Sequence, residues 1–107
     1  MSVTVRVAHP SDTPLILDFI KKLAEYERLL HEVEASEADI RRDLFGENPR
    51  AFCDIAEVEG RPVGFALWFY SYSTFRGRAG IYLEDLFVEP GARGEGAGKA
   101  LRRRLAQ

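Results

Sequence analysis

The stretch from Ile81 to Leu101 reads IYLEDLFVEPGARGEGAGKAL and decides the fold. The run from Ala79 to Val88 is apolar apart from two adjacent carboxylates, which predicts a strand. A glycine-rich segment, Arg93 to Lys99, follows, and residues Gly98 to Gln107 have the pattern of a helix. A glycine loop that opens a helix gathers free backbone N–H groups in one hollow, where a phosphate or pyrophosphate binds well.

Two common phosphate motifs do not fit this loop. A P-loop needs Gly where Arg93 stands and Ser or Thr where Ala100 stands. The dinucleotide fingerprint fits Gly94 and Gly96 but meets Lys99 at its third glycine. The pattern that remains is R-G-x-G-x-G-x-x-L, for which a glycine-rich turn without a ligand is the alternative. Because glycines at a helix start cost helix stability, we favour an anion site.

The rest of the chain predicts an α/β (α+β) domain around a mixed, mostly antiparallel sheet, in the order β-α-α-β-β-β-α. The evidence is alternating valines near the N-terminus, apolar residues at three- and four-residue steps, and apolar runs separated by turns. The expected elements before the final helix are a strand over 3–7, a helix from Ser11 or Asp12 to about Leu30, a short helix from the capping box Ser36–Asp39 to Leu44 or Phe45, and strands over 51–58, 63–72 and 79–88.

Length and composition exclude several classes of protein. The 107 residues form one domain, and 46% hydrophobic with 30% charged residues is an ordinary globular composition. No apolar run reaches the roughly 18 residues of a membrane span, and no signal-peptide core precedes Pro10, so we expect a cytoplasmic protein without membrane contact. The lone Cys53 excludes a disulfide framework, and His9 and His31 lack metal-pair spacing, so no metal is expected.

Charge is divided unevenly along the chain. Residues 1–75 carry eight Lys and Arg against thirteen Asp and Glu, whereas residues 76–107 carry seven against four. The first part suits a cationic partner and the second an anionic one, although two solvated helix faces are the simpler alternative. A net charge of −2 is not that of a nucleic-acid binder.

The segment from Ile81 to Leu101 resembles the acetyl-CoA signature of the GNAT superfamily of N-acetyltransferases. The stretch from Tyr82 to Val88 is similar to the spermidine/spermine (diamine) and thialysine N-acetyltransferase family, as are Leu23–Glu27, Phe45–Gly46 and Val63–Ala66. The resemblance implies a GNAT-like fold, transfer of an acetyl group from acetyl-CoA to a primary amine of a diamine, polyamine or lysine analogue, and a homodimer. A non-catalytic module that binds CoA or phosphate is the alternative.

The resemblance also implies roles for individual residues. The backbone of Leu86, Phe87 and Val88 would pair with the pantetheine arm. The pyrophosphate would lie on the loop formed by Arg93, Gly94, Glu95, Gly96, Ala97, Gly98 and Lys99.

Four side chains are expected at the amine: Tyr26, Glu27, Glu84 and Asp85. Glu84 is the candidate proton acceptor, because burial in an apolar strand would raise its pKa, while Asp85 should point to the other face of the strand. The segment after Tyr72 has Ser73 where the polyamine enzymes carry an acidic residue, which favours a smaller amine or a lysine analogue.

The same resemblance implies further elements after the final helix, including a tyrosine that protonates the leaving thiolate. The four tyrosines of this chain lie too early to match it. We therefore expect the chain to correspond to the N-terminal two-thirds of such an enzyme, with the C-terminal elements missing and little or no catalysis of its own.

Overall fold

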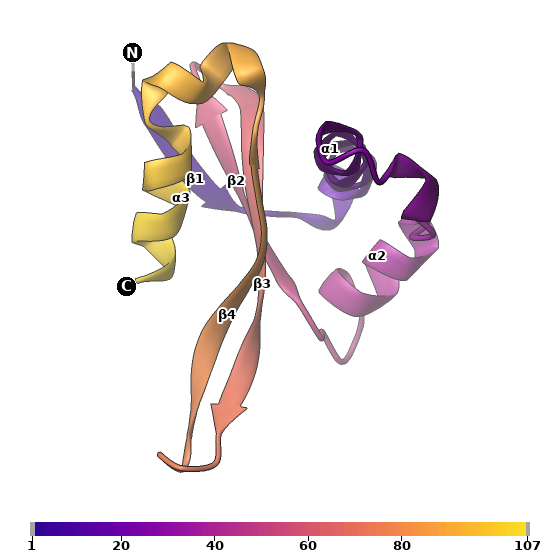
Figure 1. Cartoon of the computed structure of the whole chain (residues 1–107), viewed down its shortest axis with the longest axis vertical. Coiled ribbons are helices and arrows are strands. Elements are labelled where there is room, and N and C mark those ends of the chain that lie inside the picture. The colour runs from indigo at the N-terminus through magenta and orange to yellow at the C-terminus, as the bar shows by residue number, and fades with distance from the viewer. Residues whose placement is uncertain (1, 107) are drawn as a thin grey trace.

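A four-stranded antiparallel sheet lies between two layers of helices in the computed structural model, which describes residues 2–106 (Figure 1). The strand order β1-β2-β3-β4 follows the sequence, so the expected fold class and element order are confirmed. The elements are β1 (Val3–Val7), α1 (Thr13–Tyr26), α2 (Glu37–Phe45), β2 (Phe52–Val58), β3 (Arg61–Ser73), β4 (Arg78–Val88) and α3 (Ala97–Leu105), with 3₁₀ turns η1 (Pro10–Asp12), η2 (Leu30–Glu32) and η3 (Pro90–Glu95). Gln107, the expected end of the last helix, lies outside the described residues.

Each face of the sheet has its own apolar core. On the face of α1 and α2, the rings of Phe19 and Phe65 are fully buried and stack with centroids 5.5 Å apart. On the opposite face, Ala97 and Leu101 of α3 pack with no exposed surface onto residues of β2 and β3. Truncation of one buried ring to Ala would cost about 3–5 kcal/mol of stability. Together the two cores fix α1 and α3 on opposite sides of the sheet.

Helix α1 begins as expected and ends earlier than expected. Asp12 is its N-cap residue, yet the Asp12 carboxylate accepts hydrogen bonds from Arg6 at 2.7 and 2.9 Å and from the His9 N–H, so it ties the helix start to β1. The sequence pattern predicts a helix to about Leu30, but Arg28 has a φ of 62° and ends it at Tyr26. Tyr26 is therefore the last residue of α1.

Strand β4 contains a bulge at Glu84. Asp85 is opposite Leu67 and Leu83 is opposite Trp68, so Glu84 has no partner on β3. Because the bulge absorbs one residue, Leu83 and Leu86 both pack against the core under α3, while Asp85 and Phe87 face α1. The hydrophobic pattern of the sequence does not predict this change of phase.

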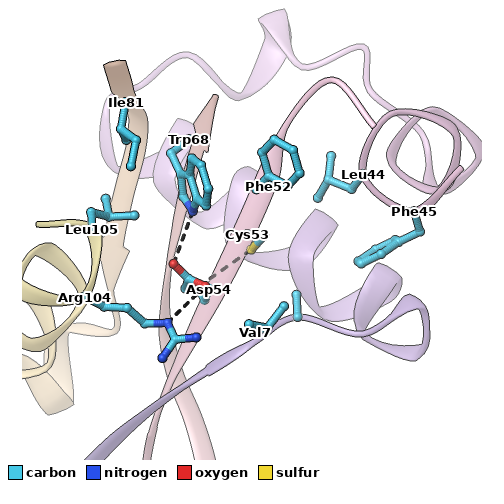
Figure 2. Close-up of a pocket in the computed structure, with 11 residues that line it drawn as sticks. Val7, Leu44, Phe45, Phe52, Cys53, Asp54, Trp68, Ile81, Arg104 and Leu105 are labelled. Carbon is cyan, nitrogen blue, oxygen red and sulfur yellow. Dashed lines mark hydrogen bonds and ion pairs between the residues drawn. The ribbon is translucent and has the colours of Figure 1, made fainter. Parts of the chain in front are cut away.

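An ion pair between the exposed Arg104 and the buried Asp54 holds the C-terminal end of α3 to the sheet. Asp54 of β2 accepts a hydrogen bond from the Trp68 Nε1–H at 3.2 Å and lies 3.5 Å from Arg104 Nε (Figure 2). These groups border a cavity of 420 Å³ with mostly apolar walls. The neighbouring Cys53 is buried, and burial raises the pKa of its thiol, so Cys53 is a packing residue here.

The distal halves of β3 and β4 extend beyond the helices as a two-stranded ribbon (Figure 1). Tyr70 and Ile81 are opposite each other on it, and Phe75 at its tip is fully exposed.

Among residues 2–106, no helix combines the length and apolarity required to cross a membrane.

We predict that Gly64→Ala destabilises the fold by about 1–3 kcal/mol, because the added methyl group over-packs the β3–β4 pair. A Cβ at Gly64 would lie 2.5 Å from the Phe87 carbonyl oxygen and 3.1 Å from Val88 Cα. Gly80→Ala is the matched control, since its nearest atom, Ser71 Oγ, would be 3.8 Å away. Urea denaturation of both variants checks this, and equal stability losses would contradict it.

Candidate functional site

The glycine loop bends the chain sharply from β4 into α3. After η3, Gly96 adopts a φ of 82° and caps α3, which starts at Ala97. The first intrahelical bond runs from Ala100 N to Gly96 O at 3.0 Å. The N–H groups of Ala97, Gly98 and Lys99 therefore precede the helical hydrogen-bond ladder and are available to an anion.

The edge of β4 presents backbone groups beside this loop. Glu89 N donates to Val63 O on β3 at 2.7 Å. Because hydrogen-bonding directions alternate along an antiparallel strand, the backbone groups of Val88 and Leu86 point away from β3. Phe87 turns its backbone toward β3, and its side chain packs on Phe19 with ring centroids 6.0 Å apart. Of the three residues expected to pair with pantetheine, Leu86 and Val88 thus direct backbone groups away from the sheet and Phe87 does not.

We call the cavity between α1, the end of β4 and the glycine loop the loop hollow. Its volume is 410 Å³, and Arg93 and Lys99 bring positive charge to it. A Cβ added at Gly98 would make only an ordinary contact of 3.7 Å with Val88 Cγ2, and one at Gly94 would meet nothing within 4 Å. The fold itself leaves this space open, which fits a bulky anion. The lining residues are Leu23, Tyr26, Leu86, Phe87, Val88, Arg93, Gly96, Gly98 and Lys99.

A second cavity, the acidic hollow, lies beside the first between α1, η2 and β4. It has a volume of 270 Å³ and carries the carboxylates of Glu27, Glu32 and Asp85 among apolar walls. Asp85 is half-buried, and burial followed by the charges of Glu84 and Glu27 raises its pKa. A cation bound here would relieve this repulsion. The lining residues are Ile20, Leu23, Ala24, Glu27, Leu29, Glu32, Val33 and Asp85.

The expectation that Glu84 is buried is wrong. Its side chain is exposed at the bulge, and the neighbouring Asp85 is the carboxyl group with restricted access to solvent. The apolar run around Glu84 indicates burial only for a regular strand, and the bulge breaks that regularity. Its charge nevertheless acts on Asp85, its neighbour in sequence.

Tyr26 lies apart from the other residues expected at the amine. Its ring borders the loop hollow, and the Arg93 guanidinium carbon lies 4.7 Å from the ring centroid. Arg93 Nε also donates to Val88 O at 3.0 Å. The structure thus brings Glu27 together with Asp85, and Tyr26 together with Arg93.

The remaining loop residues differ in exposure. Gly94 is exposed, Glu95 is half-buried, and the Ala97 side chain belongs to the core under α3.

Three residues that line the hollows were not predicted from the sequence: Leu23 and Val33 as apolar walls, and Glu32 as a third carboxylate. Glu32 does lie in the acidic first part of the chain. Within residues 2–106, no three His, Cys, Asp or Glu side chains converge as a metal ion requires. The expected absence of a metal stays a prediction.

Known proteins resemble this chain over nearly its whole length. It is 42% identical over 113 residues to a thialysine N-epsilon-acetyltransferase of Bos taurus, an alignment that covers 98% of this chain and 66% of the relative. It is 39% identical to spermidine/spermine N(1)-acetyltransferase-like protein 1 of Homo sapiens, covering 96% of this chain and 16% of that protein. The chain thus spans slightly less than two-thirds of the length of the bovine relative.

The fold and the family agree with these relatives. The crystal structure of an aminoglycoside acetyltransferase from an uncultured soil metagenomic sample superposes with a TM-score of 0.78 at 15% identity, over 98% of this chain and 68% of the other, which shows a common fold. The sequence profile described as the acetyltransferase (GNAT) family matches residues 16–107. The chain therefore belongs to the GNAT family of acetyltransferases.

Proposed function

We propose that this chain carries the acetyl-CoA and amine sites of an N-acetyltransferase that acts on a primary amine of a small molecule. The observation that carries the proposal is the pair of adjacent hollows, one bordered by cations and helix N–H groups and the other by carboxylates. Leu23 of α1 forms a wall of both. An anionic cosubstrate and a cationic substrate could therefore meet at one place on β4.

On the cosubstrate side, the first turn of α3 and the side chains of Arg93 and Lys99 would hold the pyrophosphate. The outward backbone groups of Leu86 and Val88 would bind the pantetheine arm as a neighbouring strand would. Bound acetyl-CoA would supply the acetyl group as a thioester. The open space at Gly94 and Gly98 supports this placement.

On the amine side, the carboxylates of Glu27 and Asp85 would hold the ammonium form of the substrate and lose their mutual repulsion as they do so. Acetyl transfer requires a neutral amine, so a base must take a proton. We propose Glu84 for this role, because its exposed carboxylate at the bulge can receive the proton directly or through water and release it to solvent. Glu84 is thus the acceptor and Asp85 the anchor.

The substrate that we propose is a lysine analogue such as thialysine, or another short amine. The 42% identity to a thialysine N-epsilon-acetyltransferase supports this choice, as does Ser73 at the place where polyamine enzymes carry an acidic residue. The small volume of the acidic hollow, 270 Å³, is also suited to a short substrate. The cytoplasmic setting expected from the sequence stays a prediction.

Gly98→Ala should weaken CoA binding without lowering stability. Gly98 lies in the first turn of α3, where Ala is the better helix former, so we expect unchanged or slightly higher stability. The methyl group would fill space required by the pyrophosphate and weaken CoA binding about tenfold, the equivalent of one lost hydrogen bond to a charged group. Calorimetric titration with CoA and thermal unfolding of each variant provide the check.

Gly96→Ala is the matched control for this prediction. At a φ of 82°, alanine strains the backbone, so this variant should lose about 1–2 kcal/mol of stability. If Gly98→Ala binds CoA like the unaltered chain, the loop is only a turn. If the unaltered chain does not bind CoA at millimolar concentration, the proposed function is wrong.

Glu84→Gln and Asp85→Asn should separate proton transfer from amine binding. We expect Glu84→Gln to lower the already low kcat of this chain about 10²- to 10⁴-fold with CoA affinity unchanged, since only the base is lost. Asp85→Asn should mainly raise the KM of the amine. Release of free CoA from acetyl-CoA, measured with thialysine, spermidine and ornithine in turn, gives both constants.

The outcomes of these assays also separate an enzyme from a binding module. Equal loss of turnover and CoA affinity in Glu84→Gln would argue against Glu84 as proton acceptor. A chain that binds CoA but releases none with any of the amines would be a non-catalytic CoA-binding module or an inactive fragment of such an enzyme.

The exposed ribbon supports a homodimer. Tyr70 is 60% exposed, and Ile81 opposite it borders the apolar cavity of Figure 2, so an apolar strip continues from that cavity along the ribbon. Burying such a strip is a common reason for self-association. We propose that a second copy of the chain covers it.

Replacing Tyr70 and Ile81 together with Lys should therefore give a monomer, because two charges would be buried in the interface. Sedimentation equilibrium measures the mass, with Arg78→Lys on the same ribbon as the control. A monomeric unaltered chain at high micromolar concentration would contradict the proposal.

A further inference from the structure

We propose that Tyr26 is a positioning residue on the cosubstrate side of the site. Its ring holds the Arg93 guanidinium against the end of β4, in the place where Arg93 meets the pyrophosphate of CoA. The inference rests on the proposed function and assigns Tyr26 a role different from the amine contact that the sequence suggests.

Two contacts fix the Arg93 side chain. Its Nε donates to the Val88 carbonyl oxygen at 3.0 Å, and its guanidinium carbon lies 4.7 Å from the centroid of the Tyr26 ring. A guanidinium group is planar and has five N–H donors. With its guanidinium carbon over the ring and Nε on the carbonyl, the group is held in place and both Nη groups remain for an anion. This pre-orders the fork that pairs with phosphate oxygens.

Ordinary helix packing does not explain Tyr26. Its side chain is 66% exposed and lies at the last position of α1, outside the core formed by Phe19 and its neighbours. Its exposed ring borders the loop hollow, whereas the next residue, Glu27, borders the acidic hollow. Two consecutive residues at the end of α1 thus border different hollows. Tyr26, which borders the loop hollow, is the one that contacts Arg93.

The stack also links three segments distant in sequence. Tyr26 ends α1, Val88 ends β4, and Arg93 lies in η3 at the start of the glycine loop. Lys22, one turn before Tyr26, pairs with Glu89 at 2.7 Å and draws the same parts of α1 and β4 together. The ring of Tyr26 is therefore held at a defined place relative to the loop.

The test compares CoA with pantetheine, which lacks the pyrophosphate, by calorimetric or NMR titration. We expect Tyr26→Leu to weaken CoA binding about two- to fivefold, the size of an exposed cation–π contact, and to leave pantetheine binding unchanged. Tyr26→Phe keeps the ring and should bind CoA normally. In an Arg93→Gln background, Tyr26→Leu should have little further effect, because its partner is gone. Tyr82→Leu, an exposed tyrosine on the ribbon, is the matched control.

Several results would overturn the inference. Unchanged or tighter CoA binding by Tyr26→Leu, an equal loss of pantetheine binding, or additive effects with Arg93→Gln would each show that Tyr26 does not act through Arg93. A raised KM for the amine with normal CoA affinity in Tyr26→Leu would indicate that Tyr26 contacts the amine substrate instead. In these cases the unaltered chain still binds CoA and the proposed function stands. If the unaltered chain fails to bind CoA, both the inference on Tyr26 and the proposed function are wrong.

Discussion

The bulge at Glu84 is the constraint on which the site depends. In a regular strand, Asp85 would share a face with Leu83 and enter the apolar core under α3, where a carboxylate without a partner is costly. The extra residue turns Asp85 toward α1 and brings Leu86 to the core instead. The bulge thereby lets β4 present apolar side chains to α3 on one face and the Asp85 carboxylate to the acidic hollow on the other. Bulges often redirect a side chain in this way beside functional sites.

The parts that local chemistry determines could be predicted from the sequence. The capping box of Ser36 and Asp39 is present at the start of α2, and the glycine loop does open a helix. The burial of Glu84 could not be predicted, because period-two reasoning assumes that pairing with β3 is unbroken. The end of α1 was misplaced for a similar reason: Leu29 and Leu30 continue an apolar pattern that the left-handed Arg28 interrupts. Bulges and single left-handed residues leave little trace in hydrophobic periodicity.

Two aspartates of this domain are both shielded from solvent but differ in their partners. Asp85 is held where burial and the charges of Glu84 and Glu27 disfavour its ionised form, and no cation contacts it among the described residues. Burial raises the pKa of Asp54 as well, but Asp54 has Trp68 and Arg104 as partners (Figure 2). Asp54 thus has partners that offset its burial, whereas Asp85 is left with the repulsion of two neighbouring carboxylates. The difference between these two aspartates favours a ligand role for Asp85.

Helix α3 is held at both ends, and the two attachments explain how a glycine-rich loop can keep a defined shape. At its C-terminal end, Arg104 pairs with Asp54 of the sheet. At its N-terminal end, the buried Ala97 fixes the first turn, and Arg93 ties the preceding η3 to Val88. Of the three glycines Gly94, Gly96 and Gly98, only Gly96 has a positive φ that favours glycine, and Gly94 and Gly98 have room for a side chain. Because the fold does not need glycine at those two positions, the small residues there are best explained by a ligand that lies against the loop.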